Sequence, residues 1–409
     1  MAPHMTEHNR TDELNLHVCY ISHHPFPTNV GTAMNVYIEY LTEMGVEVTV
    51  IAGRNKGEPS SESVHGADVH RIKTDNSSKY LDRNLFAYNG FKKINSINQQ
   101  NSIDVLHLRA FPNTGFFLRP IPKPDSTAIM LDVRATGISN QLYNYISRIM
   151  IRAQHRLADH TTVIDDHVKT GIWGKNSPSG ISILPLGVDM SEFSPGQNKE
   201  LRKNLDIPPN AKVLGYIGHL HKSRELTTML TAVGEVISDN PQVHLLIVGK
   251  GNGLGELQKK AKTLGIEKHI TFTGEVPFNR IPDYLNSFDV GLAYIPNKVQ
   301  YKNQPPIKTA EYLSAGLPVV ATNTPGNKRF VTQGYNAILS SDDSEEYAAA
   351  IEDLVEDEKL CARLSSRARE SIEEFDYAKI VRRDLIPAYK KAVEAAGYDN
   401  SDRYTPRIK

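Results

Sequence analysis

The sequence predicts an α/β protein of two domains, each built around a mostly parallel sheet. Three observations lead to this fold class: the length of the chain, two separate series of short apolar runs, and a proline-rich stretch between them. A chain of 409 residues exceeds what one hydrophobic core usually organises, so two domains of ordinary size are expected. Apolar runs that alternate with helix-length amphipathic segments are typical of strands covered by helices on both faces.

The first series begins with a predicted strand at residues 16–21, followed by a loop, a helix at 34–44 and a second strand at 46–51. A strand, a helix and a strand in this short space predict a βαβ unit, whose right-handed crossover requires parallel strands. Further short apolar runs lie at residues 105–108, 128–133 and 161–164.

The second series supplies apolar runs at residues 213–218, 245–249, 270–272, 290–293 and 318–321. Segments of helical length, such as residues 225–238, separate them. Between the two series, residues 185–209 hold several prolines, which favours a domain join there. We therefore predict an N-terminal domain over residues 14–190 and a C-terminal domain over residues 191–376. Helices at about 377–397 are expected to pack back on the first domain.

The composition is that of an ordinary globular enzyme, with 39% hydrophobic residues, 23% charged residues and a formal net charge of zero. The two cysteines, Cys19 and Cys361, lie far apart in the chain, which predicts neither a disulfide framework nor a zinc site. No apolar stretch has the roughly 18–20 residues of a membrane span, and residues 1–15 lack the apolar core of a signal peptide. We therefore expect a cytoplasmic protein that does not bind nucleic acid.

Positive charge is concentrated in one part of the first domain. Residues 70–156 hold thirteen Lys or Arg against five Asp, an excess that either faces an anionic partner or is solvated. Within this stretch, residues 79–93 mix aromatic and cationic side chains, as an interfacial segment does, although an ordinary surface helix has the same pattern. Residues 70–156 are thus a candidate for peripheral contact with the inner face of a membrane.

Two loops that follow predicted strands are candidates for binding phosphate. The loop at residues 24–33 contains Gly31 and runs directly into a helix, whose free amides and positive end favour an anion. A tight turn without a ligand fits the same residues. In the second domain, His219 and Arg224 lie five residues apart where another strand meets a helix, and both can present positive charge to a diphosphate. A solvated basic loop is the alternative.

The segment at residues 305–322 combines several signals. Prolines precede a short predicted helix, Gly316 ends it, and a buried strand follows. Glu311 then lies in an early turn, where a carboxylate can accept hydrogen bonds from both hydroxyls of a ribose. Lys308 and the free amides near Thr309 can hold phosphate oxygens. A glutamate that caps the helix is the alternative.

Several segments resemble those of glycosyltransferase family 4. Residues 183–195 are similar to the family's linker signature, in which a glycine, a valine and an aspartate precede a phenylalanine and a proline. Residues 311–320 resemble its donor segment Glu-Tyr-Leu-x-x-Gly-x-Pro-Val-Val. The stretches 248–251, 272–277 and 289–292 are similar to its intervening motifs. The resemblance extends from about residue 16 to the last helices.

This resemblance implies the GT-B fold, in which two Rossmann-like α/β/α domains have parallel sheets facing a central cleft. It also implies a nucleotide-sugar donor, most often a UDP-sugar, and transfer that retains the anomeric configuration. By the same resemblance Glu311 would bind the nucleotide ribose, and Gly31 and Thr32 would approach the diphosphate and the sugar. Gly274 and Val276 would lie against the base.

Four positions depart from the family's pattern. His219 stands where the family usually has arginine and Arg224 where it usually has lysine, so positive charge is kept, although that of His219 depends on pH. Asn303 replaces a second glutamate, eight positions before Glu311, that contacts the sugar. Arg109 takes the place of an active histidine. A guanidinium can bind a phosphate or an acidic sugar, but it cannot act as a general base.

Asp132 and Arg134 lie at the end of another first-domain strand. Residues at strand ends line the ligand crevice of parallel sheets, so both are candidates for contact with the acceptor or the sugar. A buried ion pair between the two is an equal alternative. His107, two residues before Arg109, is interpreted as a hydrogen-bonded core residue rather than a catalyst.

The sequence therefore predicts a retaining glycosyltransferase that moves a sugar from a nucleotide diphosphate sugar to a hydroxyl of a glycan or lipid-linked acceptor. His219, Arg224 and Arg109 are the catalytic candidates, because cations stabilise the leaving diphosphate. No metal or other cofactor is expected, since no Asp-x-Asp motif lies in a suitable place. The alternatives are a catalytically silent GT-B subunit of a glycosyltransferase assembly and a sugar-nucleotide 2-epimerase, which would need carboxylates near the sugar.

Overall fold

The computed structural model describes residues 15–27, 33–73, 79–110, 127–134 and 141–397, with the backbone alone at 79–84, 141 and 143. The chain forms two compact units. Unit 1 comprises Met1–Pro185 and Ala378–Lys409, and unit 2 comprises Leu186–Tyr377. The borders therefore fall after Pro185 and Tyr377, whereas the borders predicted from the sequence lie after residues 190 and 376.

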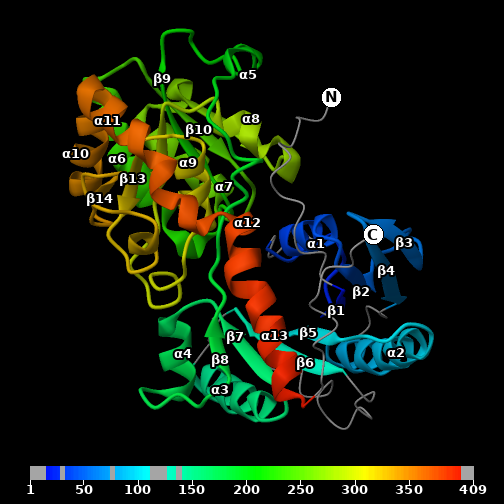
Figure 1. Ribbon diagram of the computed structural model, residues 1–409. Helices are drawn as coiled ribbons and strands as arrows, with labels where there is room; N and C mark the ends of the chain where they lie inside the picture. Colours follow the sequence, from blue (N-terminus) through cyan, green and yellow to red (C-terminus); the bar gives the residue numbers. More distant parts are fainter. Residues whose placement is uncertain (1–14, 28–32, 74–78, 111–126, 135–140, 398–409) are drawn as a thin grey trace, which may run out of the picture. The chain divides into compact units, whose positions relative to one another are not determined.

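Unit 1 is built on an eight-stranded sheet. Its strands are β1 (His17–Ser22), β2 (Glu47–Arg54), β3 (Ser61–Val64), β4 (Ala67–Lys73), β5 (Val105–Arg109), β6 (Ala128–Val133), β7 (His160–Val163) and β8 (Ile181–Ile183). They lie in the order β3-β4-β2-β1-β5-β6-β7-β8 (Figure 1). All neighbours are parallel except β3 and β4, which form an antiparallel hairpin at one edge. Strands β1 and β6 are buried along their whole length, because layers of structure cover both faces of the sheet.

A helix from the C-terminal part of the sequence covers part of this sheet. The earlier helices of unit 1 are α1 (Ala33–Glu43), α2 (Lys79–Gln100), α3 (Gln141–His155) and α4 (Asp166–Trp173). After residue 376 the chain returns through α12 (Tyr377–Ile380) and a π-helical turn (Val381–Leu385) into α13 (Ile386–Ala395). Helix α13 packs against β5, β6 and β7, and its Tyr389 is fully buried.

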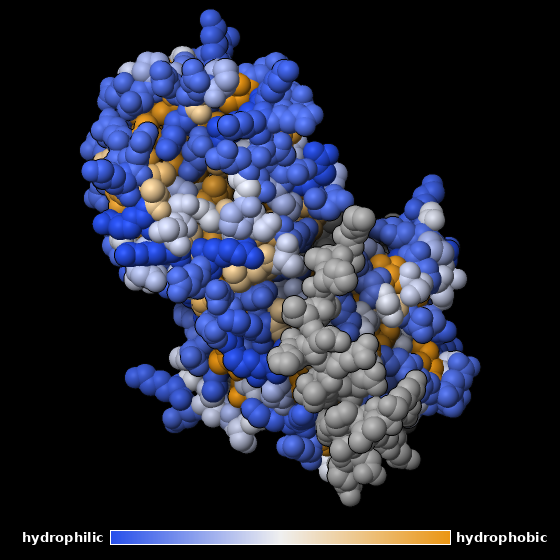
Figure 2. All heavy atoms as spheres, turned by 45° about the horizontal axis from the view of Figure 1, so that its top comes forward, coloured by the Kyte–Doolittle hydropathy of each residue, from blue (hydrophilic) through white to orange (hydrophobic). Residues whose placement is uncertain are grey.

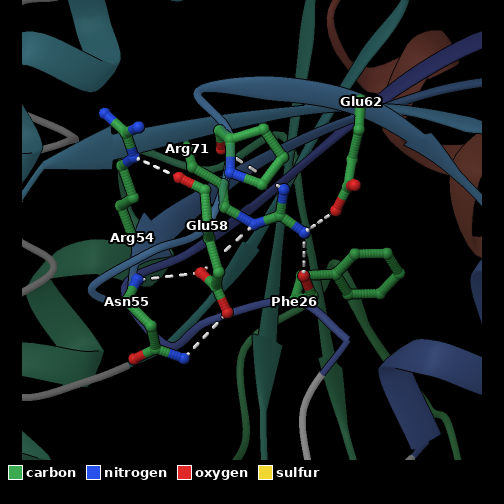
Figure 3. A network of polar contacts seen from close by, with 7 residues as sticks. Phe26, Arg54, Asn55, Glu58, Glu62 and Arg71 are labelled. Atoms are coloured by element: carbon green, nitrogen blue, oxygen red, sulfur yellow. Dashed lines mark hydrogen bonds and ion pairs between the residues drawn. The ribbon is translucent and has the colours of Figure 1, made fainter.

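A buried arginine fastens the β3–β4 hairpin to the loop that follows β1 (Figure 3). The side chain of Arg71 is only 2% exposed. Its Nη2 donates to the carbonyl oxygen of Phe26 at 2.7 Å and lies 2.5 Å from Glu62, while its Nε lies 3.4 Å from Glu58. A buried guanidinium needs such partners because removing it from water is costly. The network holds the backbone just ahead of residues 28–32, which lie outside the described residues.

Unit 2 is built on six strands, all parallel. They are β9 (Lys212–Ile217), β10 (Val243–Val248), β11 (Ile270–Gly274), β12 (Val290–Ala293), β13 (Val319–Thr322) and β14 (Ile338–Ser340). Their order is β11-β10-β9-β12-β13-β14. The chain thus builds outward from β9 in one direction and then from β12 in the other. Ligands of open α/β sheets bind at the carboxyl ends of the strands beside such a reversal.

Helices cover both faces of the second sheet. They are α5 (Lys199–Asn204), α6 (Leu226–Asp239), α7 (Leu254–Leu264), α8 (Ile281–Leu285), α9 (Ile307–Ser314), α10 (Ser344–Glu356) and α11 (Glu358–Ala368). Leu214 and Tyr216 of β9 pack in a cluster with α6, α7 and α10. Val213 and Ile217 pack in a second cluster with α8 and α9. Because successive side chains of a strand point to opposite faces, these clusters are the two core layers.

The predicted fold class of an α/β protein with two parallel-sheet domains is confirmed. The face drawn in Figure 2 is mainly hydrophilic, and its hydrophobic side chains form small separate groups. The hairpin of β3 and β4 is not predicted from sequence, because β3 is mostly exposed and lacks an apolar run. That the two sheets face a central cleft stays a prediction.

Candidate functional site

In unit 2, the carboxyl ends of β9, β10 and β11 bring three glycines together. Gly218 and Gly249 have φ angles of 147° and 142°, a backbone region that residues other than glycine rarely adopt. A Cβ on Gly249 would lie 2.0 Å from the carbonyl oxygen of Gly218. The Gly249 amide also donates to the carbonyl oxygen of Gly274 at 2.8 Å. The three loops therefore meet through backbone alone, beside the reversal of strand order.

The loop after β9 carries two of the predicted catalytic cations. It passes through a 3-10 turn at Lys222–Arg224 before α6 begins. His219 is exposed, whereas Arg224 is half-buried. The guanidinium carbon of Arg224 lies 5.1 Å from the ring centre of Tyr301, at a distance typical of a cation–π contact. This contact places Arg224 beside the loop that leads into α9.

Lys308 is a buried cation without a hydrogen-bond partner among the described residues. Its Nζ lies 3.7 Å from the ring centre of Tyr216 and 3.1 Å from where a Cβ on Gly218 would stand. Burial lowers the pKa of Lys308 well below its usual range, the charge of Arg224 lowers it further, and Glu311 raises it. An unpaired buried ammonium ion is costly, and an anionic ligand would remove that cost.

Glu311 lies one turn further along α9. Burial raises the pKa of Glu311 to about 7, the negative charge of Glu192 raises it further, and the charge of Lys308 lowers it. Its carboxylate accepts no hydrogen bond in the part of the chain that the structure describes. Helix α9 begins after Pro306 without a side-chain cap, which leaves its first amides to water or a ligand. Unpaired charges of both signs and free amides therefore lie on one short helix.

The side chain of Thr309 is used inside the fold. It is fully buried, and its hydroxyl donates to Oδ1 of Asn327 at 2.8 Å. Asn327 is itself fully buried and donates to the carbonyl oxygen of Thr322 at 2.8 Å. The backbone amide of Thr309 donates to the carbonyl oxygen of Pro306 at 3.0 Å, so both hydrogen-bond donors of Thr309 have partners within the protein.

The remaining predicted donor residues lie on three loops. Gly274 has a φ of 74° at the end of β11, and no atom lies within 4 Å of where its Cβ would stand. Val276 is partly buried against the core, and Asn303 is half-buried in the loop before α9. Gly31 and Thr32 lie outside the described residues.

In unit 1, Asp132 at the end of β6 is surrounded by hydrogen-bond donors. Arg134 Nε donates to Oδ2 at 2.6 Å, and the Thr162 hydroxyl donates to Oδ1 at 3.0 Å. His107 Nε2 lies 3.5 Å from Oδ2. Burial alone would raise the pKa of Asp132, but Arg134 and His107 hold it well below its usual range. Asp132 is therefore a fully ionised, well-partnered buried carboxylate.

His107 belongs to a buried chain of hydrogen bonds. Its Nδ1 lies 2.9 Å from the hydroxyl of Tyr389, which lies 2.7 Å from the hydroxyl of Tyr20. Burial lowers the pKa of His107, so the ring is neutral. Because the carboxylate of Asp132 can only accept, the ring proton lies on Nε2, and Nδ1 accepts from Tyr389. His107 is thus a hydrogen-bonded core residue, as interpreted from the sequence.

Arg134 and Arg109 give this edge of unit 1 an excess of positive charge. Arg134 pairs with Asp132 and lies 5.1 Å from the ring centre of Tyr37, yet its buried Nη1 has no hydrogen-bond partner within the part of the chain that the structure describes. Arg109 ends β5 and stands opposite Asp132 in the sheet register. Burial lowers the pKa of Arg109, and Asp132 raises it. The structure therefore contains the buried Asp132–Arg134 ion pair, while their contact with an acceptor stays a prediction.

Two protein-family models match the chain. The model described as Glycosyltransferase Family 4 matches residues 30–192, and the model described as Glycosyl transferases group 1 matches residues 197–371. The chain is a glycosyltransferase with one domain of family 4 and one domain of group 1. The first match covers most of the N-terminal part of unit 1 and the second covers most of unit 2, so this glycosyltransferase has one matched domain in each unit.

Curated relatives of this glycosyltransferase differ in how much of the chain they match. The D-inositol 3-phosphate glycosyltransferase of Rhodococcus erythropolis is 27% identical over 231 residues, which are 54% of this chain and 50% of that protein. The chain thus spans about half the length of the first curated relatives it matches. Spore coat protein SA of Bacillus subtilis is 23% identical over 396 residues, 90% of this chain and 97% of that protein.

Solved structures show the same fold over nearly the whole chain. Sucrose-phosphate synthase from Thermosynechococcus elongatus matches with a TM-score of 0.74 and 16% identity, over 93% of this chain and 100% of that chain. Anabaena Alr3699/HepE, solved in complex with UDP and glucose, matches with a TM-score of 0.68 and 17% identity, over 90% and 98% of the two chains. The likeness to such structures shows the GT-B fold, and it assigns no residue role at this identity.

Three residues that act on the candidate site residues of the two units were not identified from the sequence. The ring of Tyr216 contacts the ammonium group of Lys308. The one sequence feature that could have indicated Tyr216 is its phenol in an otherwise apolar predicted strand. Glu192, which acts on Glu311, lies inside the linker signature but has no assigned role there. Tyr389 contacts His107 across 282 positions of sequence, and no local pattern indicates that contact.

The described residues contain neither a candidate metal site nor a candidate membrane span. No group of three or more His, Cys, Asp or Glu side chains is placed to hold a metal ion. No helix has both the length and the apolar character needed to cross a membrane. The expectation that the enzyme needs no metal stays a prediction.

Proposed function

We propose that this glycosyltransferase transfers a sugar from a nucleoside diphosphate sugar to a hydroxyl of a glycan or lipid-linked acceptor, with retention of configuration. A UDP-sugar is the favoured donor. The observation that carries the proposal is the unpaired, buried ammonium group of Lys308 on the same short helix as the unpaired carboxylate of Glu311. A nucleoside diphosphate has an anion for the first group and ribose hydroxyls for the second.

In this proposal the diphosphate is held by positive groups around the glycine loops. Lys308, Arg224 and the first amides of α9 would bind phosphate oxygens, and His219 would add charge when it is protonated. Because the leaving diphosphate gains negative charge in the transition state, these groups would lower the barrier electrostatically. Glu311 would accept hydrogen bonds from the ribose.

Retention is proposed to occur on one face of the sugar. The bond from the anomeric carbon to the phosphate oxygen breaks as the acceptor hydroxyl attacks, and the hydroxyl proton passes to the departing phosphate oxygen. Asp132 is an unsuitable nucleophile because its oxygens already accept hydrogen bonds from Arg134 and Thr162, and His107 lies 3.5 Å from Oδ2. Arg109 would then bind a phosphate or an acidic sugar, and Asp132 and Arg134 would contact the acceptor or the sugar.

The donor site is tested by nucleotide binding. Titration calorimetry would measure the affinities of UDP and GDP for the wild type and for the Glu311→Ala and Arg224→Ala variants. We expect each variant to lose at least about tenfold in affinity for the preferred nucleotide, since charge-assisted contacts are removed. Glu235→Ala and Lys259→Ala, two exposed positions on α6 and α7, are the matched controls. Wild-type affinity in both site variants would overturn the assignment.

The reaction class is tested with a panel of nucleotide sugars and hydroxyl acceptors. Release of a nucleoside diphosphate that depends on acceptor supports a transferase, and the configuration of the product reports retention or inversion. Interconversion of the sugar without release would instead support a 2-epimerase. Nucleotide binding without either reaction would support the catalytically silent subunit. The departures from the family's pattern at Asn303 and Arg109 favour that alternative.

A further inference from the structure

Helix α3 of unit 1 exposes a group of large apolar side chains. Leu142 is 68% exposed, Tyr145 is 63% exposed, and Ile146 and Ile149 are each 46% exposed. These four account for nearly half of the large hydrophobic residues that are exposed in the part of the chain that the structure describes. Single exposed apolar residues are common on protein surfaces, but a group on one helix marks an interaction surface.

The four side chains form one stripe. Their spacing along the chain is three, one and three residues, so at about 100° per residue they lie within an arc of about 100° on the helix. The opposite side of α3 buries Ser147, Ile151 and Gln154, two of which are polar. The helix thus directs its larger apolar surface away from its own domain, which is the reverse of an ordinary surface helix.

Arginines flank this stripe and no acid accompanies them. Arg148, Arg152 and Arg156 are all exposed, and residues 141–157 contain no Asp or Glu. By the same angular spacing, Arg148 and Arg152 follow one flank of the apolar stripe, and Arg156 comes directly after the last residue of the helix. Nε of Arg152 donates to the carbonyl oxygen of Ile172 at 2.7 Å, which ties this flank to α4. An apolar stripe with arginines along one flank complements a surface that is apolar inside and anionic at its boundary.

We propose that the apolar side of α3, defined by Leu142, Tyr145, Ile146 and Ile149, is a docking surface for an anionic lipid bilayer. The helix lies in the plane of the interface, its apolar side chains enter the boundary between headgroups and acyl chains, and its arginines contact lipid phosphates. Tyr145 suits this depth because its ring is apolar and its hydroxyl is polar. The proposal narrows the contact predicted for residues 70–156 to one helix.

A second copy of the chain fits this surface less well. A symmetric contact through α3 would bring its arginines against the arginines of the other copy without an acid from this helix to pair them. Four apolar side chains also fall far short of the roughly 20–30 residues per side of a standard interface. A bilayer needs no matching protein surface and supplies many anionic groups.

Docking to lipid goes beyond the proposed sugar transfer and is tested without any activity. The full chain would be floated with vesicles of phosphatidylglycerol and phosphatidylcholine in equal parts, and separately with vesicles of phosphatidylcholine alone. We expect binding to the anionic vesicles at low salt and binding at least about tenfold weaker to the neutral ones. Raising the salt from about 0.05 M to about 0.5 M should weaken the anionic binding, because it screens exposed charges.

Two variants separate the apolar and the charged contributions. Ile146→Ser with Ile149→Ser removes apolar contact, and Arg148→Glu with Arg156→Glu reverses the charge of the border. Each double variant should bind the anionic vesicles at least about tenfold more weakly, and each should keep the thermal midpoint of the wild type because the altered side chains are exposed. Val299→Ser, at a residue of unit 2 that is 80% exposed, is the control and should bind as the wild type does.

Three results would overturn the proposal. The first is no binding to either kind of vesicle. The second is equal binding of the two double variants and the wild type. The third is a concentration-dependent dimer, seen by sedimentation without lipid, that the Ile146→Ser and Ile149→Ser changes abolish, since the stripe would then contact a second copy.

Discussion

Two carboxylates, that of the buried Asp132 in unit 1 and that of the half-buried Glu311 in unit 2, have opposite surroundings. Asp132 at the end of β6 accepts hydrogen bonds from Arg134 and Thr162 and lies against His107, and its pKa is held well below its usual range. Glu311 in α9 accepts no hydrogen bond from the described residues, and burial raises its pKa to about 7. One carboxylate is stabilised as an anion by its own fold, and the other is not.

The difference distinguishes a charge that the fold itself compensates from charges that, in our proposal, a ligand compensates. Around Asp132 the charge is compensated within the domain, so its removal should harm stability first. At α9 the cost of removing Lys308 and Glu311 from water is compensated only in part, by their mutual attraction and by the ring of Tyr216. Removing either charge should therefore harm binding while relieving the free protein. Charged groups on α9 that lack hydrogen-bond partners among the described residues are therefore the better guide to the proposed donor site.

The largest effect is expected from Asp132→Asn. The change leaves the charge of Arg134 buried without its anion, which should lower the free energy of unfolding by about 3–5 kcal/mol. Urea unfolding followed by circular dichroism measures it. Asp68→Asn, at an exposed position of β4, should stay within about 0.5 kcal/mol of the wild type. A loss below about 1 kcal/mol for Asp132→Asn would remove the contrast between the two carboxylates.

The opposite sign is expected from Glu311→Gln. Because the folded pKa is raised from 4.5 to about 7, the stability that protonation of Glu311 contributes is full below about pH 4.5 and is lost as the pH rises through about 7. Glutamine removes that loss, so the variant should gain about 1–3 kcal/mol at pH 8 and little near pH 4.5, as unfolding at the two pH values would show.

The same Glu311→Gln protein should bind UDP more weakly at pH 8, since an amide accepts fewer hydrogen bonds from a ribose than a carboxylate does. Glu235→Gln on α6 is the matched control and should change neither property. If the Glu311→Gln protein is less stable at pH 8 than the wild type, the fold stabilises the Glu311 anion as it does that of Asp132, and the contrast fails.

The smallest effect is expected from Tyr389→Phe. The phenylalanine removes the donor to His107 Nδ1 and the partner of the Tyr20 hydroxyl, which should cost about 1–2 kcal/mol while leaving Asp132 its other donors. Thermal unfolding measures the loss, and Tyr88→Phe, at an exposed position of α2, is the control. An unchanged thermal midpoint would show that the chain of hydrogen bonds does not extend to α13.

The parallel strands could be predicted because buried strands of this kind are continuous apolar runs. Residues 128–133 and 245–249 correspond closely to β6 and β10. The β3–β4 hairpin lacks that pattern, and its buried Arg71 acquires partners only when the loop at Phe26 lies beside it. Local periodicity does not reveal such a contact.

The candidate site could be predicted in part. Lys308 and Glu311 are indicated by a helix start after prolines, and their position on α9 follows from that pattern. That neither has a hydrogen-bond partner among the described residues is a property of the packed protein. Their neighbours Tyr216 and Glu192 likewise come from distant segments. The hydroxyl of Thr309 is bound to Asn327, which no spacing rule places beside it.

The return of α13 to unit 1 has a consequence for biosynthesis. Residues 386–395, which cover β5, β6 and β7, leave the ribosome only after all of unit 2 has been made. Until then Tyr20 and His107 lack the hydroxyl of Tyr389, and one side of the sheet remains open. We expect unit 2 to complete its folding before unit 1 does, so that the first-translated sheet is the one exposed longest to chaperones and proteases.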